Sequence, residues 1–89
     1  MDLPLSGLKI LSFEQYGAGP FGTQYLADLG AEVIKVEPAG TNGDYLRDIG
    51  PYFIDGEDRN SASSIFFQAL NRNKKSITLN VLSDEGKQI

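Results

Sequence analysis

Cysteine and histidine are both absent from the 89 residues of this sequence. Without cysteine the chain can form no disulfide and offers no thiol nucleophile, and without histidine it has no imidazole base. A zinc site built from the usual cysteine and histidine ligands is excluded as well, so we expect no metal site. This composition is compatible with a reducing compartment.

The sequence also lacks any apolar run that approaches the length needed to span a membrane. Residues 1–5 lack the charged and apolar regions of a signal peptide, so we expect a cytoplasmic protein with no membrane partner. The formal net charge is −4, which argues against nucleic acid as a partner. A chain of this length forms one small domain at most.

One stretch, residues 17–37, organises what the sequence does contain. A glycine-rich turn leads into a helix that we expect to begin at Pro20, because proline suits the first helical position, and to end at Gly30. Strand-like apolar runs at residues 8–13 and 33–37 flank this helix. A strand, a helix and a strand in about thirty residues have the size of a βαβ unit. The sequence therefore predicts an α/β fold with parallel strands.

The predicted helix carries an apolar stripe, in which Phe21, Tyr25 and Leu29 recur every fourth residue with Leu26 beside them. We expect this stripe to lie on the sheet and the first strand to be largely buried. The remaining faces of the helix carry Thr23, Gln24 and Asp28.

Beyond this unit, the sequence predicts a long irregular segment over residues 38–60, whose length is typical of a functional or mobile loop. A short helix over residues 61–70 follows, with Ser61 or Ser63 as its N-cap. After a polar turn we expect a third strand over residues 76–81, and then a helix capped by Ser83. The apolar side of the short helix comprises Ile65, Phe66, Ala69 and Leu70.

Three strands need more helices than these to cover both faces of a sheet. We therefore expect residues 1–89 to be an incomplete, N-terminal part of a larger domain.

Gly17, Gly19 and Gly22 fit the G-x-G-x-x-G pattern of dinucleotide-binding proteins, and Glu37 follows twenty residues after Gly17. In that interpretation the helix N-terminus binds pyrophosphate and the acid binds the ribose hydroxyls. Pro20 weighs against it, because it removes a backbone N–H from the turn that would hold the pyrophosphate. A fragment of an NAD-dependent oxidoreductase stays open as an alternative. Turn geometry and close helix packing explain the glycines equally well.

Three separated motifs carry a more specific resemblance. In chain order they are L-S-G-L-K-I-L, A-G-P-F-G-T-Q-Y-L-A-D-L-G-A-E-V-I-K-V-E-P and N-R-N-K-K-S-I-T-L-N. Together they resemble the N-terminal segment of the family III CoA-transferases, which include formyl-CoA and carnitine CoA-transferases and α-methylacyl-CoA racemases. The resemblance covers nearly all of the chain and implies a Rossmann-like domain that uses no nicotinamide cofactor.

The resemblance also implies where CoA would lie. In this family the first βα loop lies against CoA and the acyl thioester, and an apolar residue of a later strand lies near the adenine. The residues at the loop positions, expected to border the pantetheine end, are Gln15, Tyr16, Gly17 and Ala18, and the residue at the strand position is Leu79.

Two features of the family are not matched. Pro38 stands where several members place an arginine that meets a CoA phosphate, so that contact is not expected here. The family's catalytic aspartate lies much farther along the chain and no aspartate here corresponds to it, so we assign no catalytic residue. The resemblance implies coenzyme A or acyl-CoA as a substrate, with no tightly bound cofactor.

The parent protein is therefore expected to move CoA from an acyl-CoA donor to a carboxylic acid acceptor and to form an interlocked homodimer, as the family does. An acyl-CoA racemase of the same family is one alternative. A truncated chain that acts only as an interaction module is another.

Among the polar and aromatic residues, Tyr16 is the one we predict to be functional beyond the resemblance, because an aromatic side chain in a strand-end loop can pack on a ligand. Glu37 is expected to cap the strand end or to pair with a neighbouring base rather than to bind ribose. Asp28 is expected to be a solvated or structural helix residue. A polar turn explains the charge of Arg72, Lys74 and Lys75 better than contacts with CoA phosphates do.

Overall fold

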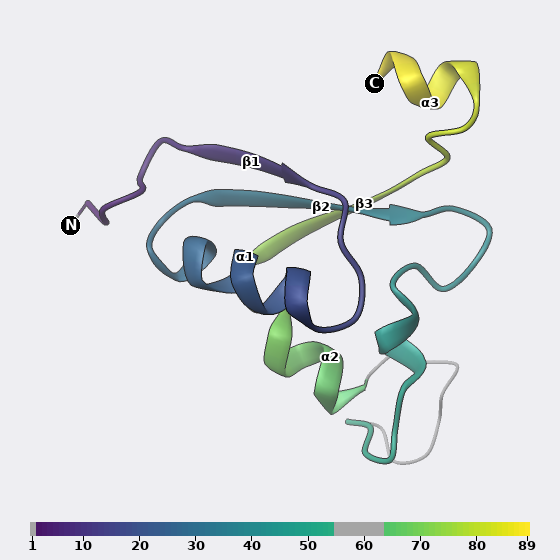
Figure 1. The fold of residues 1–89 in the computed structure, drawn as a ribbon, viewed down its shortest axis with the longest axis horizontal. Helices are drawn as coiled ribbons and strands as arrows, with labels where there is room; N and C mark the ends of the chain where they lie inside the picture. The colour runs from purple at the N-terminus through teal and green to yellow at the C-terminus, as the bar shows by residue number, and fades with distance from the viewer. Residues whose placement is uncertain (1, 55–63) are drawn as a thin grey trace.

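The computed structural model describes residues 2–54 and 64–89. Its centre is a three-stranded parallel sheet in the order β1-β2-β3, formed by β1 (Lys9–Ser12), β2 (Glu32–Pro38) and β3 (Lys74–Leu79) (Figure 1). The α/β class and the parallel pairing predicted from the sequence are confirmed. Within the described ranges, no helix is long and apolar enough to cross a membrane.

The βαβ unit predicted over the first third of the chain is β1, α1 (Ala18–Asp28) and β2. The helix begins two residues earlier than predicted, so Pro20 lies inside its first turn, where its missing N–H still has no intrahelical partner. Gly30 ends the helix with φ +108°, a conformation that glycine adopts without strain. In the register of the two strands, Lys9 pairs with Glu32 and Ser12 with Lys35.

The connection from β2 to β3 contains a short 3-10 helix, η1 (Tyr45–Asp48), and the helix α2 (Ile65–Leu70). The N-cap of α2 is Ser64, whose hydroxyl accepts the N–H of Phe67. The predicted caps, Ser61 and Ser63, lie outside the described residues. Strand β3 begins two residues before its predicted start.

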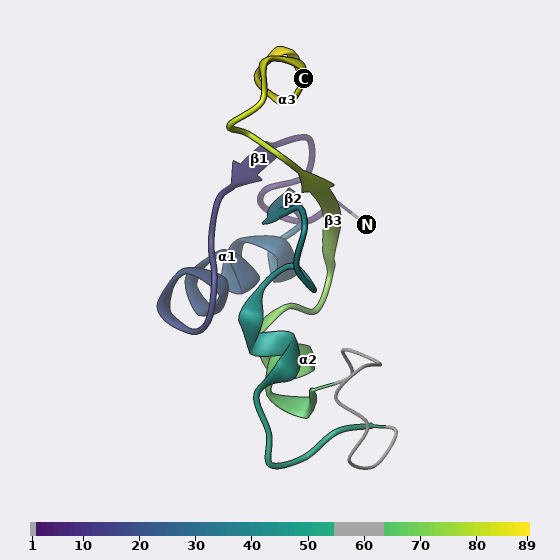
Figure 2. The same ribbon diagram turned by 90° about the vertical axis from the view of Figure 1, so that its right-hand side faces the viewer.

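The last helix, α3 (Asp84–Gln88), follows β3. Its predicted cap is confirmed, because the Ser83 hydroxyl accepts the N–H of Gly86. In Figure 2, α1 and α2 lie on one side of the sheet and α3 lies on the other.

The predicted buried face of α1 is wrong. Phe21 is 49% exposed and Tyr25 59% exposed, whereas the buried residues of the helix are Pro20, Gln24 and Ala27. Gln24 is buried without penalty because its side-chain oxygen accepts the N–H of Arg72 at 3.1 Å. The small side chain of Ala27 brings the helix close to β2, where Ala27, Ala31 and Val33 form the apolar core.

The buried residue of α2 lies outside the apolar set named from the sequence. Its buried residue is Phe67, while Ile65 and Phe66 are each about half exposed. The Arg47 guanidinium lies 3.9 Å from the centre of the Phe67 ring, so a cation–π contact with η1 fixes which side of α2 faces inward.

The two faces of the sheet differ in polarity. The face toward α1 is apolar at Ile10 and Val33 and becomes polar toward the carboxyl ends of the strands, where Glu14 and Lys35 are buried. The opposite face carries Leu11, Phe13, Ile77 and Leu79. Leu11 is 60% exposed and Phe13 65% exposed, so the expectation of a largely buried first strand is wrong: within the described residues only the short α3 lies on that face.

Candidate functional site

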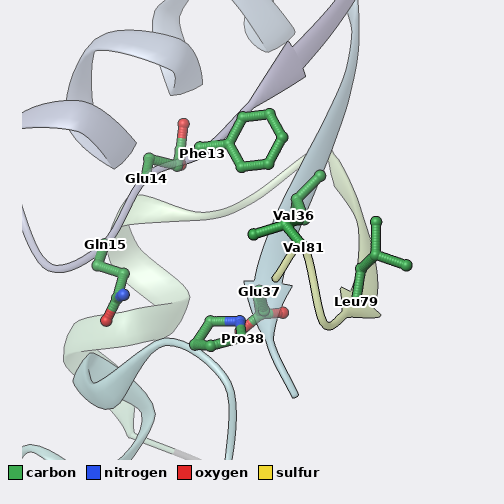
Figure 3. Close-up of a pocket in the computed structure, with 8 residues that line it drawn as sticks. All are labelled: Phe13, Glu14, Gln15, Val36, Glu37, Pro38, Leu79 and Val81. Carbon is green, nitrogen blue, oxygen red and sulfur yellow. The ribbon is translucent and has the colours of Figure 1, made fainter. Parts of the chain in front are cut away.

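A hollow of about 330 Å³ opens at the carboxyl ends of the three parallel strands (Figure 3). This is the edge at which open α/β sheets bind their ligands. The side chains around it are mostly apolar, with polar groups from the first βα loop and from the end of β2. The lining residues are Phe13, Glu14, Gln15, Val36, Glu37, Pro38, Leu79 and Val81.

The structure brings some of the predicted site residues together and leaves others apart. Gln15, from the loop after β1, and Leu79, at the end of β3, line the same hollow although β2 separates their strands. Tyr16 lies beyond the hollow lining and is 44% exposed. Gly17 is the N-cap of α1 and Ala18 its exposed first residue, so these two continue the loop away from the hollow.

A buried ionic network lies beside this hollow. Lys35 of β2 donates to Asp44 at 2.6 Å and to the side-chain oxygen of Asn71 at 2.9 Å, and its Nζ lies 3.5 Å from Glu14. Lys74 of β3 donates to the same Glu14 at 2.6 Å. All four charged side chains are at most 3% exposed, so each charge is compensated within the protein rather than by water.

The pKa shifts in this network follow from burial and hydrogen bonding. Burial alone would raise the pKa of Glu14, but hydrogen bonds donated by Lys74, Ser12 and Thr23 outweigh it and hold the pKa below its ordinary value. Burial lowers the pKa of Lys74, and its bond to Glu14 offsets this only in part.

Glu37 forms a second buried contact, at the end of β2. The Arg47 guanidinium donates two hydrogen bonds to the Glu37 carboxylate, at 2.8 and 2.7 Å. The backbone N–H of Asp44 donates to the same carboxylate at 2.8 Å, and the Ser76 hydroxyl also donates to it. Burial would raise the Glu37 pKa, yet these donors together lower it to about 2. The expectation that Glu37 pairs with a base is confirmed. Its carboxylate is therefore engaged inside the protein and is not presented to a ribose.

The turn between β1 and α1 takes its shape from Tyr16. This residue has φ +68°, in the left-handed region, and its N–H donates to the Asp44 carboxylate at 3.1 Å. Of the three motif glycines, Gly19 alone approaches a neighbour, since a Cβ there would lie 3.1 Å from Glu14; Gly17 and Gly22 face open space. Close packing thus explains one glycine of the pattern.

Three aromatic rings gather around this turn. The Tyr16 ring is stacked on Tyr45 with a centroid distance of 5.3 Å and an interplanar angle of 7°, and it lies 6.4 Å from Phe66. Tyr45 is 51% and Phe66 49% exposed. Tyr16 itself is 44% exposed, and the three rings together form an aromatic surface.

The basic residues after α2 have separate roles. Lys74 is buried in the ionic network, so its prediction as part of a polar turn is wrong. Arg72 pairs with Asp28 at 2.6 Å and Lys75 with Glu32 at 3.3 Å, both at the surface. Asp28 is therefore structural, as predicted, and the Arg72 contact lowers its pKa.

Sequence reasoning missed Lys35, Asp44 and Tyr45. A signal for Lys35 existed, because a lysine inside an apolar strand must find a buried partner. No local pattern marks Asp44 as that partner, since it lies in an irregular segment nine residues away.

The hollow is surrounded by carboxylates that are already paired with cations. Its neighbouring carboxylates, Glu14, Glu37 and Asp44, each accept hydrogen bonds from a lysine or an arginine. Among the described residues near the hollow, these three are thus committed to ion pairs and none is placed as a free base.

Comparison with known proteins gives a consistent result. The profile of CoA-transferase family III matches residues 5–89. Succinyl-CoA:glutarate CoA-transferase of Mus musculus is 48% identical over 86 residues, which are 97% of this chain and 18% of the mouse protein. Acetyl-CoA:oxalate CoA-transferase of Acetobacter aceti is 46% identical over 83 residues, 93% of this chain and 19% of that protein.

Among solved structures, a CAIB/BAIF family protein from Brucella suis matches with a TM-score of 0.84 and 43% identity. The match covers 99% of this chain and 22% of that one. The chain thus spans about one-fifth of the length of the relatives it matches.

Proposed function

This chain belongs to CoA-transferase family III, and from that premise we propose that it supplies part of the acyl-CoA site of a longer CoA-transferase. The parent protein moves CoA from an acyl-CoA donor to a carboxylic acid acceptor. The names of the relatives support this reaction, since they describe CoA transfer to glutarate and to oxalate.

Residues 1–89 form the N-terminal part of the Rossmann-like domain in this proposal. The described carboxylates near the hollow are committed to ion pairs, which agrees with assigning the catalytic residue to a later part of the parent chain. The role of the present segment is therefore to bind CoA and to shape the site, while chemistry is supplied elsewhere.

The observation that carries the proposal is the joint lining of one hollow by Gln15 and Leu79. The proposal assigns Gln15, Tyr16, Gly17 and Ala18 to the pantetheine end of CoA and Leu79 to the adenine end. The walls suit these roles, because small-molecule sites combine apolar surfaces with a few polar groups. The hollow has room for part of a CoA molecule.

The dinucleotide interpretation loses its main support. A dinucleotide site needs an acidic residue at the end of the second strand to bind the ribose. Glu37 occupies this position, but it is only 3% exposed and forms an ion pair with Arg47. We therefore do not propose that the parent protein is an NAD-dependent oxidoreductase. A racemase of the same family is separated from a transferase by the experiment below.

The experiment uses the native gene product, purified at its full length. It is incubated with succinyl-CoA, the donor named for the mouse relative, and with glutarate, mesaconate or oxalate in turn. The expected result is a new acyl-CoA, seen by mass spectrometry, that forms when an acceptor acid is present and not without one.

A full-length protein that forms no new acyl-CoA with any acid would contradict the transferase. If it instead exchanges the α-hydrogen of a 2-methylacyl-CoA with deuterium in heavy water without an acid, the racemase is the correct member of the family. We further propose that the parent protein is cytoplasmic and forms a homodimer. Light scattering of the purified protein tests the assembly state.

A further inference from the structure

Asp44 connects two loops at the carboxyl edge of the sheet. Its side chain is fully buried, and its carboxylate accepts the N–H of Leu46 at 2.9 Å and the N–H of Tyr16 at 3.1 Å. The Lys35 ammonium donates to the same carboxylate at 2.6 Å. One side chain thus ties the loop after β1 to η1 and anchors both to β2.

The Tyr16 backbone depends on support of this kind. A tyrosine with φ +68° occupies a conformation that is unfavourable for residues with a side chain, and it persists where surrounding contacts hold it. The Asp44 carboxylate is such a contact, because it fixes the direction of the Tyr16 N–H. The anchored backbone then directs the Tyr16 ring onto Tyr45.

The aromatic surface is connected to the hollow through the loop after β1. Tyr16 follows Gln15, which lines the hollow, and the rings of Tyr16, Tyr45 and Phe66 are between 44% and 51% exposed. Stacked aromatic rings at the edge where open α/β sheets bind their ligands are suited to contact a substrate. Three rings from three separate segments offer flat apolar area of the kind that packs on an acyl chain.

We propose that Asp44 is a positioning residue of the acyl-CoA site, which holds the Tyr16–Tyr45 pair where it contacts the acyl group of the substrate. This inference rests on the proposed function and assigns the acyl group to the aromatic surface and the CoA portion to the hollow. Asp44 acts through the two rings and does not touch the substrate.

The test compares two ligands on the full-length protein. One is CoA, and the other is a thioether analogue of succinyl-CoA that cannot transfer its acyl group. The Kd of each is measured by calorimetry for the unmodified protein and for its variants. General damage to the structure would weaken both ligands, so the deciding quantity is the ratio of the two Kd values.

Tyr45→Ala, Tyr16→Gly and Asp44→Asn are each expected to raise the Kd of the analogue about tenfold more than they raise the Kd of CoA. Tyr16→Gly and Asp44→Asn are expected to weaken CoA binding as well, because Tyr16 is assigned to the pantetheine end. Tyr16→Gly removes the aromatic ring and also the backbone strain at this position, because glycine adopts φ +68° freely. Tyr45→Phe keeps the ring and is expected to keep the ratio. Tyr52→Ala, which removes a 72% exposed ring outside the aromatic surface, is the matched control.

The link between Asp44 and the rings is tested by combining variants. In the Tyr16→Gly/Tyr45→Ala double variant, Asp44→Asn is expected to add less than about twofold to the analogue Kd, because both rings that it positions are gone. A further tenfold loss there would overturn the positioning role. If Asp44→Asn does not fold, the Tyr45→Ala and Tyr16→Gly variants decide, and an unchanged ratio in both overturns the inference.

Different experimental results would overturn the inference and the proposed function. An unmodified protein that binds neither ligand overturns both. One that binds both ligands, with a ratio that no variant changes, overturns only the role of the aromatic surface.

Discussion

Lys74 and Glu14 are sixty residues apart in the sequence, and their side chains meet with 2.6 Å between Nζ and Oε2. Lys74 also donates to the carbonyl oxygens of Pro20 at 2.9 Å and Leu70 at 3.2 Å. The ammonium group therefore joins the end of β1, the first turn of α1 and the end of α2 to the start of β3. These are the elements that surround the candidate site.

Replacing Lys74 with methionine is expected to destabilise the protein strongly. It leaves Glu14 buried without its closest cation, and breaking a buried ion pair costs about 3–5 kcal/mol of unfolding free energy. The neighbouring Lys75 provides a matched control, because it is 70% exposed and pairs with Glu32 at the surface. Lys75→Met is expected to cost less than about 1 kcal/mol. Thermal unfolding of both variants checks this, and equal shifts would refute the distinction.

Stability at acidic pH is expected to depend on Glu37. Its pKa is lowered from 4.5 to about 2 in the folded protein, so the unfolded chain binds this proton more readily than the folded one. The stability from ionised Glu37 is therefore complete above about pH 5 and is lost as the pH falls toward 2. A shift of this size corresponds to roughly 3 kcal/mol.

The measurement is the unfolding temperature between pH 7 and pH 3 for the unmodified protein and for Glu37→Gln. The variant has no carboxyl to titrate, so its unfolding temperature should be lower at pH 7 and decline less steeply with acid. Parallel curves for the two proteins would show that Glu37 contributes no pH dependence.

Gly30→Ala is expected to cost more stability than Gly40→Ala. Both glycines have positive φ, so both substitutions carry a backbone strain of roughly 1–2 kcal/mol. At Gly30 the added Cβ would also lie 2.6 Å from the Cβ of Leu3, whereas at Gly40 nothing lies within 4 Å. Unfolding temperatures separate the two effects, and a similar loss at both positions would mean that Leu3 moves aside freely.

Leu79→Asn is expected to raise the KM for acyl-CoA about tenfold with little change in kcat, because it removes an apolar contact made equally with the ground and transition states. Leu82→Asn alters a leucine that is 85% exposed and outside the hollow, and should leave both constants unchanged. Steady-state kinetics of the full-length protein check this. A fall in kcat with constant KM would place Leu79 in a different role.

Local patterns predicted the parts of the fold that have local causes. The helix end at Gly30 needs a left-handed residue, and the cap at Ser83 needs a hydroxyl before an acidic turn; both are visible in a few adjacent letters. Gln15 and Leu79 are predicted from the family resemblance rather than from a local pattern. The structure places both around one hollow, and their contact with CoA stays a prediction.

The predictions that failed depended on distant partners. The sequence treats Gln24 as polar and therefore exposed, yet the N–H of Arg72, forty-eight residues away, makes its burial favourable. The sequence predicts Lys74 in a polar turn, because Glu14, its partner, lies in another strand-end loop. Burial of polar groups is decided by such tertiary contacts, which no local period encodes.

The most direct test of the central claim, that the carboxyl edge of this sheet binds CoA, is hydrogen–deuterium exchange of the full-length protein with and without CoA. The account predicts slower exchange on CoA binding in peptides that cover residues 13–18 and 78–81, with no effect of NADH. CoA binding that slows exchange only outside these peptides would contradict it.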